Sequence, residues 1–478
     1  MSAQKHDYIS SLASYVPGKL AFYGCEEAEL FSKQIATSLA AVLEKSFVWA
    51  PDKPNNRFVT TSVDGRVCSD HLWSRDAGTL LRELAMWGYL GHACFLAEIL
   101  LDLVDLNAEG YFTYPMFFYQ GKKASGDELD GTGSVLIGLA LLWKRLAGDH
   151  PMRDRIMNFF VTKESPIRYI LKKLEKTELI GGTGEFGSGI WDRDEPYCNI
   201  VQNNLLRLAL EAVATVLADA GYDDLRKQCE QDAKKLKGSI LSHMVGEDKG
   251  WIWCVHPQTL MPNQEVLEND FVRGFGGING VLAMISDVHG FDLRDHKCFL
   301  EASAKTFDRL LSAPLRKVQF EKYGIWTQFD ILAEGLLTSP SYGQGYALQV
   351  ALLLGRLDIA GELIGYLAKA TFSPPYPYRP DRDSPYHFYE RMLSPEHPKL
   401  AGYDQGCGAL NLVNVAEPLK VARVIAGIDD MGEKLQIIPR LPPGWAGYKA
   451  SNWPVLTEYG IKLYDIACEN GSIKSSAV

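Results

Sequence analysis

Residues 70–84, DHLWSRDAGTLLREL, place an indole, a guanidinium and a carboxylate (Trp73, Arg75 and Asp76) directly before an apolar helical run. The N-terminus of a helix favours acidic residues, because its free N–H groups and its dipole attract negative charge. Asp76 alone is therefore consistent with a capping residue. The tryptophan and arginine beside it have no such explanation, so we asked whether other helices of this chain begin in the same way.

The same arrangement recurs at every second helical run. Segments with helical periodicity start near residues 30, 76, 91, 131, 153, 197, 222, 275, 295, 344, 357 and 404. The even-numbered members follow loops rich in aromatic, acidic and glycine residues: WSRD, GDELDGTG, GIWDRDEPY, ENDFVRGFGG, SPSYGQGY and FYERM…AGYDQG. In each of six helix pairs, one helix follows such a loop. This pattern predicts an all-α fold, an (α/α)6 toroid whose inner helices point their N-termini at one shared face. Loops on such a rigid scaffold are typical places for function.

Three regions depart from the helical pattern. Residues 250–266 predict a β-hairpin with Pro-Asn turn chemistry, and short strands are expected from about residue 433 onward. We therefore expect a toroidal domain over 1–430 and a β-strand tail over 431–478 that packs on it. The proline- and tyrosine-rich loop 371–390 is long enough to be functional.

Composition excludes several classes of function. The net charge is −10 and no tract is rich in lysine or arginine, which argues against nucleic acid or an anionic membrane as partner. The longest apolar run, ACFLAEILLDLV, carries two acidic residues and is too short to span a bilayer. The nine cysteines lack the spacing of a disulfide framework or a zinc site, so we expect neither metal nor cofactor. The first residues form no signal peptide, which predicts a cytoplasmic protein, or a secreted one if a leader was removed.

Carboxylates with aromatic and arginine neighbours remain as the candidate chemistry. Glycoside hydrolysis uses this inventory, because it needs one protonated acid and one ionised partner on either side of the scissile bond.

Four segments resemble glucoamylases, in the same order and at similar spacing over residues 70–425. WSRDAGTLLREL resembles their Trp-x-Arg-Asp segment, in which Arg and Asp hold hydroxyls of the terminal sugar, and ELDGTGSVLIGLALLW resembles the segment that opens their fourth helix. The stretch that begins GIWDRDEPY is similar to the segment with the general acid, and the stretch that begins FYERMLSPEH is similar to the one with the catalytic base. The tail LQIIPRLPPGW resembles that of other six-hairpin glycosidases, such as the α-rhamnosidase-like and phosphorylase-like groups.

This resemblance implies catalytic roles for Asp192 as general acid and Glu390 as general base. Glucoamylases have Glu after the Trp where this chain has Asp192, which is one methylene shorter. Glu195 and Glu185 are therefore alternative acids. Each carboxylate also has a structural explanation, Asp192 as a helix cap and Glu390 as a surface group paired with a nearby arginine.

The implied reaction is a single displacement that inverts the anomeric carbon. It requires carboxyl groups roughly 6.5–9.5 Å apart, with a water between the base and the sugar. Trp73, Arg75 and Asp76 would close the pocket around the non-reducing end, so the enzyme would act from the chain end. Further residues expected in the pocket are Asp130, Trp191, Arg193, Trp326, Tyr342, Gln344 and Tyr346.

Alternatives stay open within and beyond this reaction. The sugar could be rhamnose, trehalose or an acidic sugar, and the sequence does not predict the linkage or the oligomeric state. A lyase, a phosphorylase or a catalytically inactive sugar-binding protein would use the same fold, because fold does not fix function.

Overall fold

The computed structural model of the 478-residue chain is described here for eleven segments. They are residues 3–13, 16–49, 57–63, 70–182, 197–262, 281–312, 338–372, 391–393, 404–405, 410–432 and 434–478.

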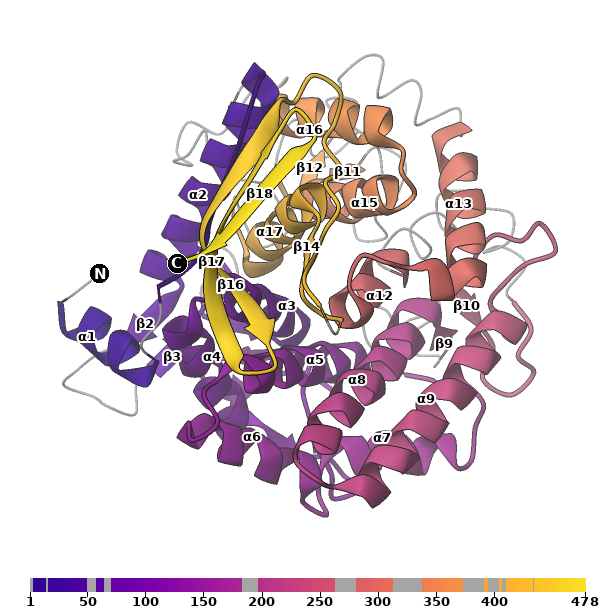
Figure 1. Cartoon of the computed structure of the whole chain (residues 1–478). Helices are drawn as coiled ribbons and strands as arrows, with labels where there is room; N and C mark the ends of the chain where they lie inside the picture. Colours follow the sequence, from indigo (N-terminus) through magenta and orange to yellow (C-terminus); the bar gives the residue numbers. More distant parts are fainter. Residues whose placement is uncertain are drawn as a thin grey trace.

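Inner helices form a closed ring around the axis of the molecule (Figure 1). Each contacts the next along the chain, and the last returns to the first. Their side chains are largely buried, which explains why their sequences are apolar on most faces. In chain order they are α3 (Ser74–Met86), α5 (Leu129–Arg145), α8 (Ile200–Asp219), α12 (Leu282–His289), α15 (Ser341–Leu353) and α17 (Leu412–Ala426).

Outer helices alternate with the inner ones and surround them (Figure 1). The (α/α)6 prediction is therefore confirmed, including which runs are inner and which are outer. An additional helix, α1 (Ala3–Leu12), precedes the ring. The outer helices are α2 (Glu26–Lys45), α4 (Leu90–Leu103), α6 (Pro151–Val161) with α7 (Pro166–Leu174), α9 (Asp223–His243), α13 (Lys297–Ser312) and α16 (Leu357–Phe372).

Two helix boundaries differ from the sequence expectation. The run expected near residue 404 begins at Leu412, because Asp404–Gln405 forms strand β13 and the Asn411 side chain caps the helix by accepting the Asn414 N–H at 2.9 Å. The single outer run expected near 153 is two helices. It is interrupted before Pro166, which starts α7 behind the capping Ser165.

Helix α8 is long and apolar enough to cross a membrane by length and composition alone. However, 89% of its most apolar window is buried inside the protein. Its apolar character is explained by its place in the inner ring, between α5 and α12.

Glycines allow α3 and α5 to approach each other closely. A Cβ at Gly78 of α3 would lie 2.4 Å from the Ser134 carbonyl carbon of α5. A Cβ at Gly138 of α5 would in turn lie 2.8 Å from the Gly78 oxygen. A larger residue at Gly78 would push apart the two helices that carry the predicted sugar-binding residues.

The C-terminal strands form an antiparallel sheet in the order β1-β16-β17-β18. Its strands are β1 (Lys19–Tyr23), β16 (Gly447–Thr457), β17 (Gly460–Glu469) and β18 (Ser472–Ala477). The tail strands were expected, but the partner strand β1 was not. The sheet packs on the ring of helices through Trp453, whose side-chain ring lies 4.9 Å from that of Trp87, the C-cap residue that follows α3. β1 belongs to the expected toroidal part, so the division at residue 430 stays a prediction.

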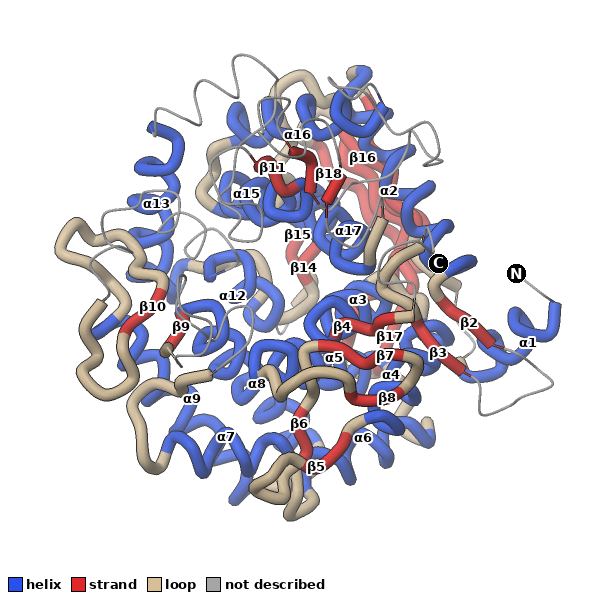
Figure 2. Tube along the Cα trace, turned by 180° about the vertical axis from the view of Figure 1, so that it is seen from behind, coloured by secondary structure: helices blue, strands red, loops and turns tan. Residues whose placement is uncertain are grey.

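Short sheets precede three inner helices (Figure 2). β4 (His71–Trp73) runs into α3 and pairs with β7 (Phe117–Tyr119), which pairs with β8 (Lys122–Lys123). β9 (Cys198–Asn199) runs into α8 and pairs with β10 (Cys254–Val255). β11 (Thr338–Pro340) runs into α15 and pairs with β12 (Arg391–Leu393), which pairs with β13 (Asp404–Gln405). These strands hold the N-terminal ends of α3, α8 and α15 in place.

The remaining short strands form pairs of two or three residues. They are β2 (Phe47–Trp49) with β3 (Arg57–Val59), β5 (Asp105–Leu106) with β6 (Phe112–Thr113), and β14 (Ile428–Asp429) with β15 (Gln436–Ile437).

The hairpin expected at 250–266 is only partly correct. Val255 bridges Pro262 around a turn at 257–259, so Pro262 lies in the bridge and not in the turn. The regular pairing of this segment is with β9, far away in the sequence.

Candidate functional site

The predicted site residues divide into two groups. Trp73, Arg75, Asp76, Asp130 and Tyr346 are described with their side chains. Tyr342 and Gln344 lie in the first turn of α15, as far as the backbone is described. The predictions for Asp192, Glu195, Glu390, Trp191, Arg193, Trp326 and Glu185 fall outside the described residues.

Trp73 is held at the start of α3 by its strand. Trp73 pairs with Phe117 where β4 lies beside β7, and the two rings lie 5.1 Å apart at a 35° tilt. The backbone N–H of Trp73 donates to Thr61 Oγ1 at 2.9 Å. Its indole Nε1 has no hydrogen-bond partner among the described residues. Strand pairing and the tilted contact with Phe117 thus hold the Trp73 ring, which retains its indole donor.

Arg75 and Asp130 come together from the first turns of α3 and α5. Arg75 Nη1 donates to Asp130 Oδ2 at 2.9 Å, and the other Asp130 oxygen accepts the Gly131 N–H at 2.8 Å. The side chain of Asp130 is 1% exposed and that of Arg75 is 16% exposed. Asp76, next to Arg75, is also buried. Two predicted sugar-binding residues 55 positions apart therefore form one charged pair at the N-terminal ends of the inner helices.

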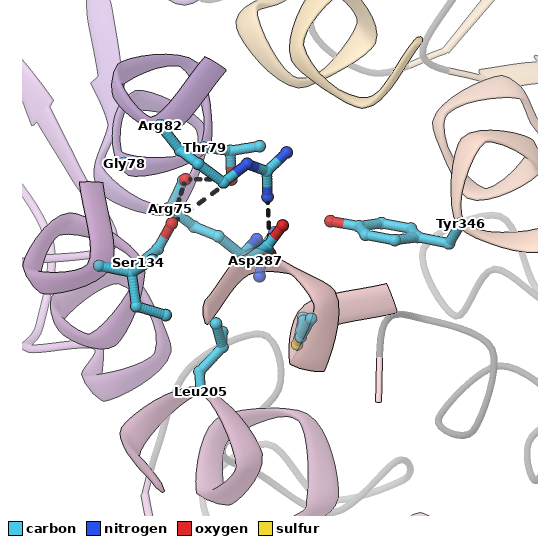
Figure 3. A pocket seen from close by; sticks show the side chains of 10 residues that line it. Arg75, Gly78, Thr79, Arg82, Ser134, Leu205, Asp287 and Tyr346 are labelled. Atoms are coloured by element: carbon cyan, nitrogen blue, oxygen red, sulfur yellow. Dashed lines mark hydrogen bonds and ion pairs between the residues drawn. The ribbon is translucent and has the colours of Figure 1, made fainter. Parts of the chain in front are cut away.

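A cavity extends from Arg75 into the ring (Figure 3). Its volume, measured as the space open to the centre of a water molecule, is about 20 Å³. Five of the six inner helices line it, and Tyr346 of α15 is among its walls. The lining residues are Arg75, Gly78, Thr79, Arg82, Ser134, Ile137, Leu205, Met284, Asp287 and Tyr346.

The cavity follows one face of α3. Arg75, Thr79 and Arg82 are spaced by four and three residues, so their side chains share a face. Seven residues of helix rise about 10 Å. Arg75 therefore lies at the rim and Arg82 two turns deeper.

Six buried charges meet at and below this deeper end. Arg82 donates to Glu83 from Nε at 2.8 Å, to Asp287 from Nη1 at 2.9 Å and to Glu417 from Nη2 at 3.1 Å. Each of these side chains is at most 7% exposed.

Three further residues complete this cluster from α15 and α17. Arg423 donates to the two Glu83 oxygens at 2.7 and 2.9 Å, and Lys420 pairs with Asp287. Gln349 donates to Glu417 at 2.5 Å. The buried cluster contains three cations and three anions, so its net charge is zero.

Pairing within the cluster opposes the effect of burial on Glu83 and Lys420. Burial alone would raise the pKa of Glu83, but Arg423 and Arg82 lower it to about 2. Burial lowers the pKa of Lys420, and Asp287 opposes that change. The cluster thus links α3, α12 and α17 through buried ion pairs.

Sequence analysis missed this cluster. Its signal was a set of charged residues inside apolar helices, such as Glu417, Lys420 and Arg423 at intervals of three within VNVAEPLKVARVIAG. Such spacing is normally a solvent-exposed stripe on a helix surface.

Known structures resemble this ring of helices. A glucoamylase from Saccharomycopsis fibuligera matches with a TM-score of 0.54 and 13% identity, covering 84% of this chain and 96% of the other. The chain has the fold of the six-hairpin glycosidases.

The same six-hairpin fold occurs in proteins with other activities. A rhamnosidase from Bacillus sp. GL1 matches with a TM-score of 0.60 and 14% identity over 96% of this chain, which spans 42% of the rhamnosidase. A cellobiose 2-epimerase from Spirochaeta thermophila matches with a TM-score of 0.55 and 12% identity, over 83% of this chain and 96% of the epimerase. No family model matches the sequence, and no curated protein matches it.

Proposed function

We propose that this protein is an inverting, exo-acting glycoside hydrolase that releases a terminal sugar from an α-linked oligosaccharide or glycoside. One observation carries the proposal: Arg75, which pairs with the buried Asp130, lines a cavity between the inner helices near their N-terminal ends. A charged hydrogen-bonding group such as the Arg75 guanidinium beside a cavity suits the hydroxyls of a terminal sugar. The likeness in fold to a glucoamylase and a rhamnosidase supports the same class of substrate.

The catalytic carboxylates in this proposal are Asp192 and Glu390. Asp192 precedes β9, which leads into α8, and Glu390 directly precedes β12, which pairs with the strand that leads into α15. The described residues that follow each carboxylate are thus held at the end of the ring that carries Arg75. This placement supports the proposed roles, with Glu195 as the alternative acid.

The reaction follows from these roles. Asp192 would give its proton to the glycosidic oxygen as the bond to the anomeric carbon breaks. Glu390 would take a proton from a water that attacks the opposite face of the sugar. The product would carry the inverted anomeric configuration, because the displacement occurs once. Arg75 and Asp130 would orient the ring of the terminal sugar for this attack.

Product analysis tests the proposal. The protein is incubated with α-linked disaccharides and plant-gum oligosaccharides, and the first product anomer is followed by NMR. Release of a single terminal sugar with inverted configuration is expected. A retained configuration would contradict the single displacement, and an isomerised or epimerised sugar without hydrolysis would point to the chemistry of the epimerase-like neighbour.

Glu390→Gln tests the base. We expect it to abolish sugar release while the melting temperature stays unchanged, because the amide cannot accept the proton from water. Glu458→Gln, in the exposed turn between β16 and β17, is the matched control and should keep wild-type rates. Wild-type rates in Glu390→Gln would show that the base is a different residue.

A further inference from the structure

Two arginines line one cavity at different depths, and each is paired with a carboxylate. Arg75 lies at the rim, backed by the buried Asp130, and Arg82 and Asp287 both line the floor. The bonded atoms are 2.9 Å apart in both pairs. Both arginines project from the same face of α3, but their carboxylates come from α5 and α12. The resemblance to glucoamylases accounts only for residues at the rim.

The floor pair retains hydrogen-bonding capacity. A guanidinium has five N–H donors. Bonds among the described residues use three of those on Arg82. A carboxylate offers about four acceptor positions. Arg82 and Lys420 occupy one on each Asp287 oxygen. A hydroxyl group can therefore accept from Arg82 while it donates to Asp287.

The Tyr346 side chain completes the floor from the opposite side. Its hydroxyl points toward the Arg82–Asp287 pair across the cavity (Figure 3). Ile137, Leu205 and Met284 supply the apolar part of the wall. The floor of the cavity thus suits a polar atom, and its apolar wall suits the carbon atom to which that polar atom is bonded.

The size of the cavity limits what can enter. About 20 Å³ of space for a water centre accommodates roughly one water-sized group. A pyranose ring is far larger, so only a short arm that projects from the ring fits.

We propose that the cavity floor binds the primary hydroxyl of a hexopyranose whose ring is held at the Arg75–Asp130 rim. The methylene of the hydroxymethyl arm lies against the apolar wall, and its oxygen lies between Arg82, Asp287 and Tyr346. Sugars with a free hydroxymethyl group are then the substrates, in preference to 6-deoxy sugars. This inference rests on the proposed function, since it names the class of sugar that the same site takes.

The buried cluster explains why this floor would be selective. Asp287 is held by Arg82 and Lys420, and Arg82 by Glu83 and Glu417, so neither side chain needs to reorganise when a hydroxyl arrives. A 6-deoxy sugar brings a methyl group to these charges and forms no bond with them. Loss of a hydrogen bond to charged partners typically weakens binding by about tenfold or more.

Monosaccharide binding tests the inference without requiring hydrolysis. The whole protein is titrated with D-glucose, D-galactose and D-mannose and with the 6-deoxy form of each, and affinity is measured by calorimetry and saturation-transfer NMR. We expect at least one parent sugar to bind about tenfold or more tightly than its 6-deoxy form.

Variants assign that preference to the floor. Tyr346→Phe and Asp287→Asn should reduce the ratio of affinities to about two or less, since they alter the contacts to the primary hydroxyl. Arg75→Lys, at the rim, should weaken both members of a sugar pair equally and leave the ratio unchanged. If Asp287→Asn fails to fold by circular dichroism, Tyr346→Phe decides alone.

The outcomes separate this inference from the proposed function. Equal binding of parent and 6-deoxy sugars, or no binding of any of the six, would overturn the floor site. Hydrolysis of glycosides with no effect of the 6-hydroxyl would leave the proposed function standing and refute the floor. Selective binding without any hydrolysis would support the floor site and refute the proposed function.

Discussion

Replacement of Glu83 by glutamine tests whether the buried cluster stabilises the ring. Glu83 is fully buried and accepts hydrogen bonds from both Arg82 and Arg423. Glu83→Gln keeps the shape of the side chain but leaves the cluster with one uncompensated positive charge. Removing one partner from a buried ion pair costs about 3–5 kcal/mol.

The pKa of Glu83 gives an independent value for the free energy by which its ion pairs stabilise the fold. Its value of about 2, against 4.5 for an ordinary glutamate, corresponds to about 3 kcal/mol at about 1.4 kcal/mol per pKa unit. Because the folded pKa is the lower one, this stabilisation is complete above pH 4.5 and is lost as the pH falls toward 2. We therefore expect Glu83→Gln to lose about 3–5 kcal/mol at pH 7 and less at pH 3.

Urea denaturation followed by circular dichroism measures the free energy of unfolding at pH 7 and at pH 3. Glu230→Gln is the matched control: its partner Arg226 lies 2.8 Å away, but the Glu230 side chain is 50% exposed. Exposed pairs contribute little, so the control should lose less than about 1 kcal/mol. A Glu83→Gln protein within 1 kcal/mol of wild type, by the same order-of-magnitude reckoning, would refute a stabilising cluster.

Further predictions concern the α3–α5 contact, the rim and the thiols. Gly78→Ala should lower the free energy of unfolding by about 1–3 kcal/mol, because its Cβ would meet the α5 backbone at 2.4 Å. Gly238→Ala in the open middle of α9 should instead raise it by up to about 1 kcal/mol in the same urea experiment. Arg75→Ala should reduce sugar binding by calorimetry at least about tenfold and lower the melting temperature, because Asp130 is left buried without this partner. Of the described cysteines, Cys298 should react first with a thiol reagent in the native protein, since it is the exposed one; a buried thiol that reacted equally fast would contradict the packing.

Local chemistry made the ring predictable from the sequence. Helix periodicity predicted where most of the helices lie. The loops rich in aromatic, acidic and glycine residues identified which helices face the axis. Trp73 and Asp130 were found in this way, since each lies at the start of an inner helix. The pairing of Arg75 with Asp130 needed the structure, because nothing in either segment indicates how two helices are turned relative to each other.

Contacts between distant parts of the chain were not predictable. The five residues of β1, KLAFY, are too few to identify a strand alone, and their partner lies in the tail. The buried cluster was missed for a related reason. Its charged side chains come from α3, α12 and α17. The charges balance only when these three helices lie together, so no single helix sequence shows that they are paired.

The pairing of β1 with β16 has a consequence for synthesis on the ribosome. Tyr23 lies opposite Gly447, which is 424 positions later in the chain, so 424 residues must be added after Tyr23 before its partner exists. At about 5–20 residues per second this takes about 20–90 s. During that time the nascent chain carries a strand with no neighbour to complete its hydrogen bonds. We expect chaperones that shield unpaired strands to engage the emerging polypeptide near its beginning, and to be released only when the final hairpin leaves the exit tunnel.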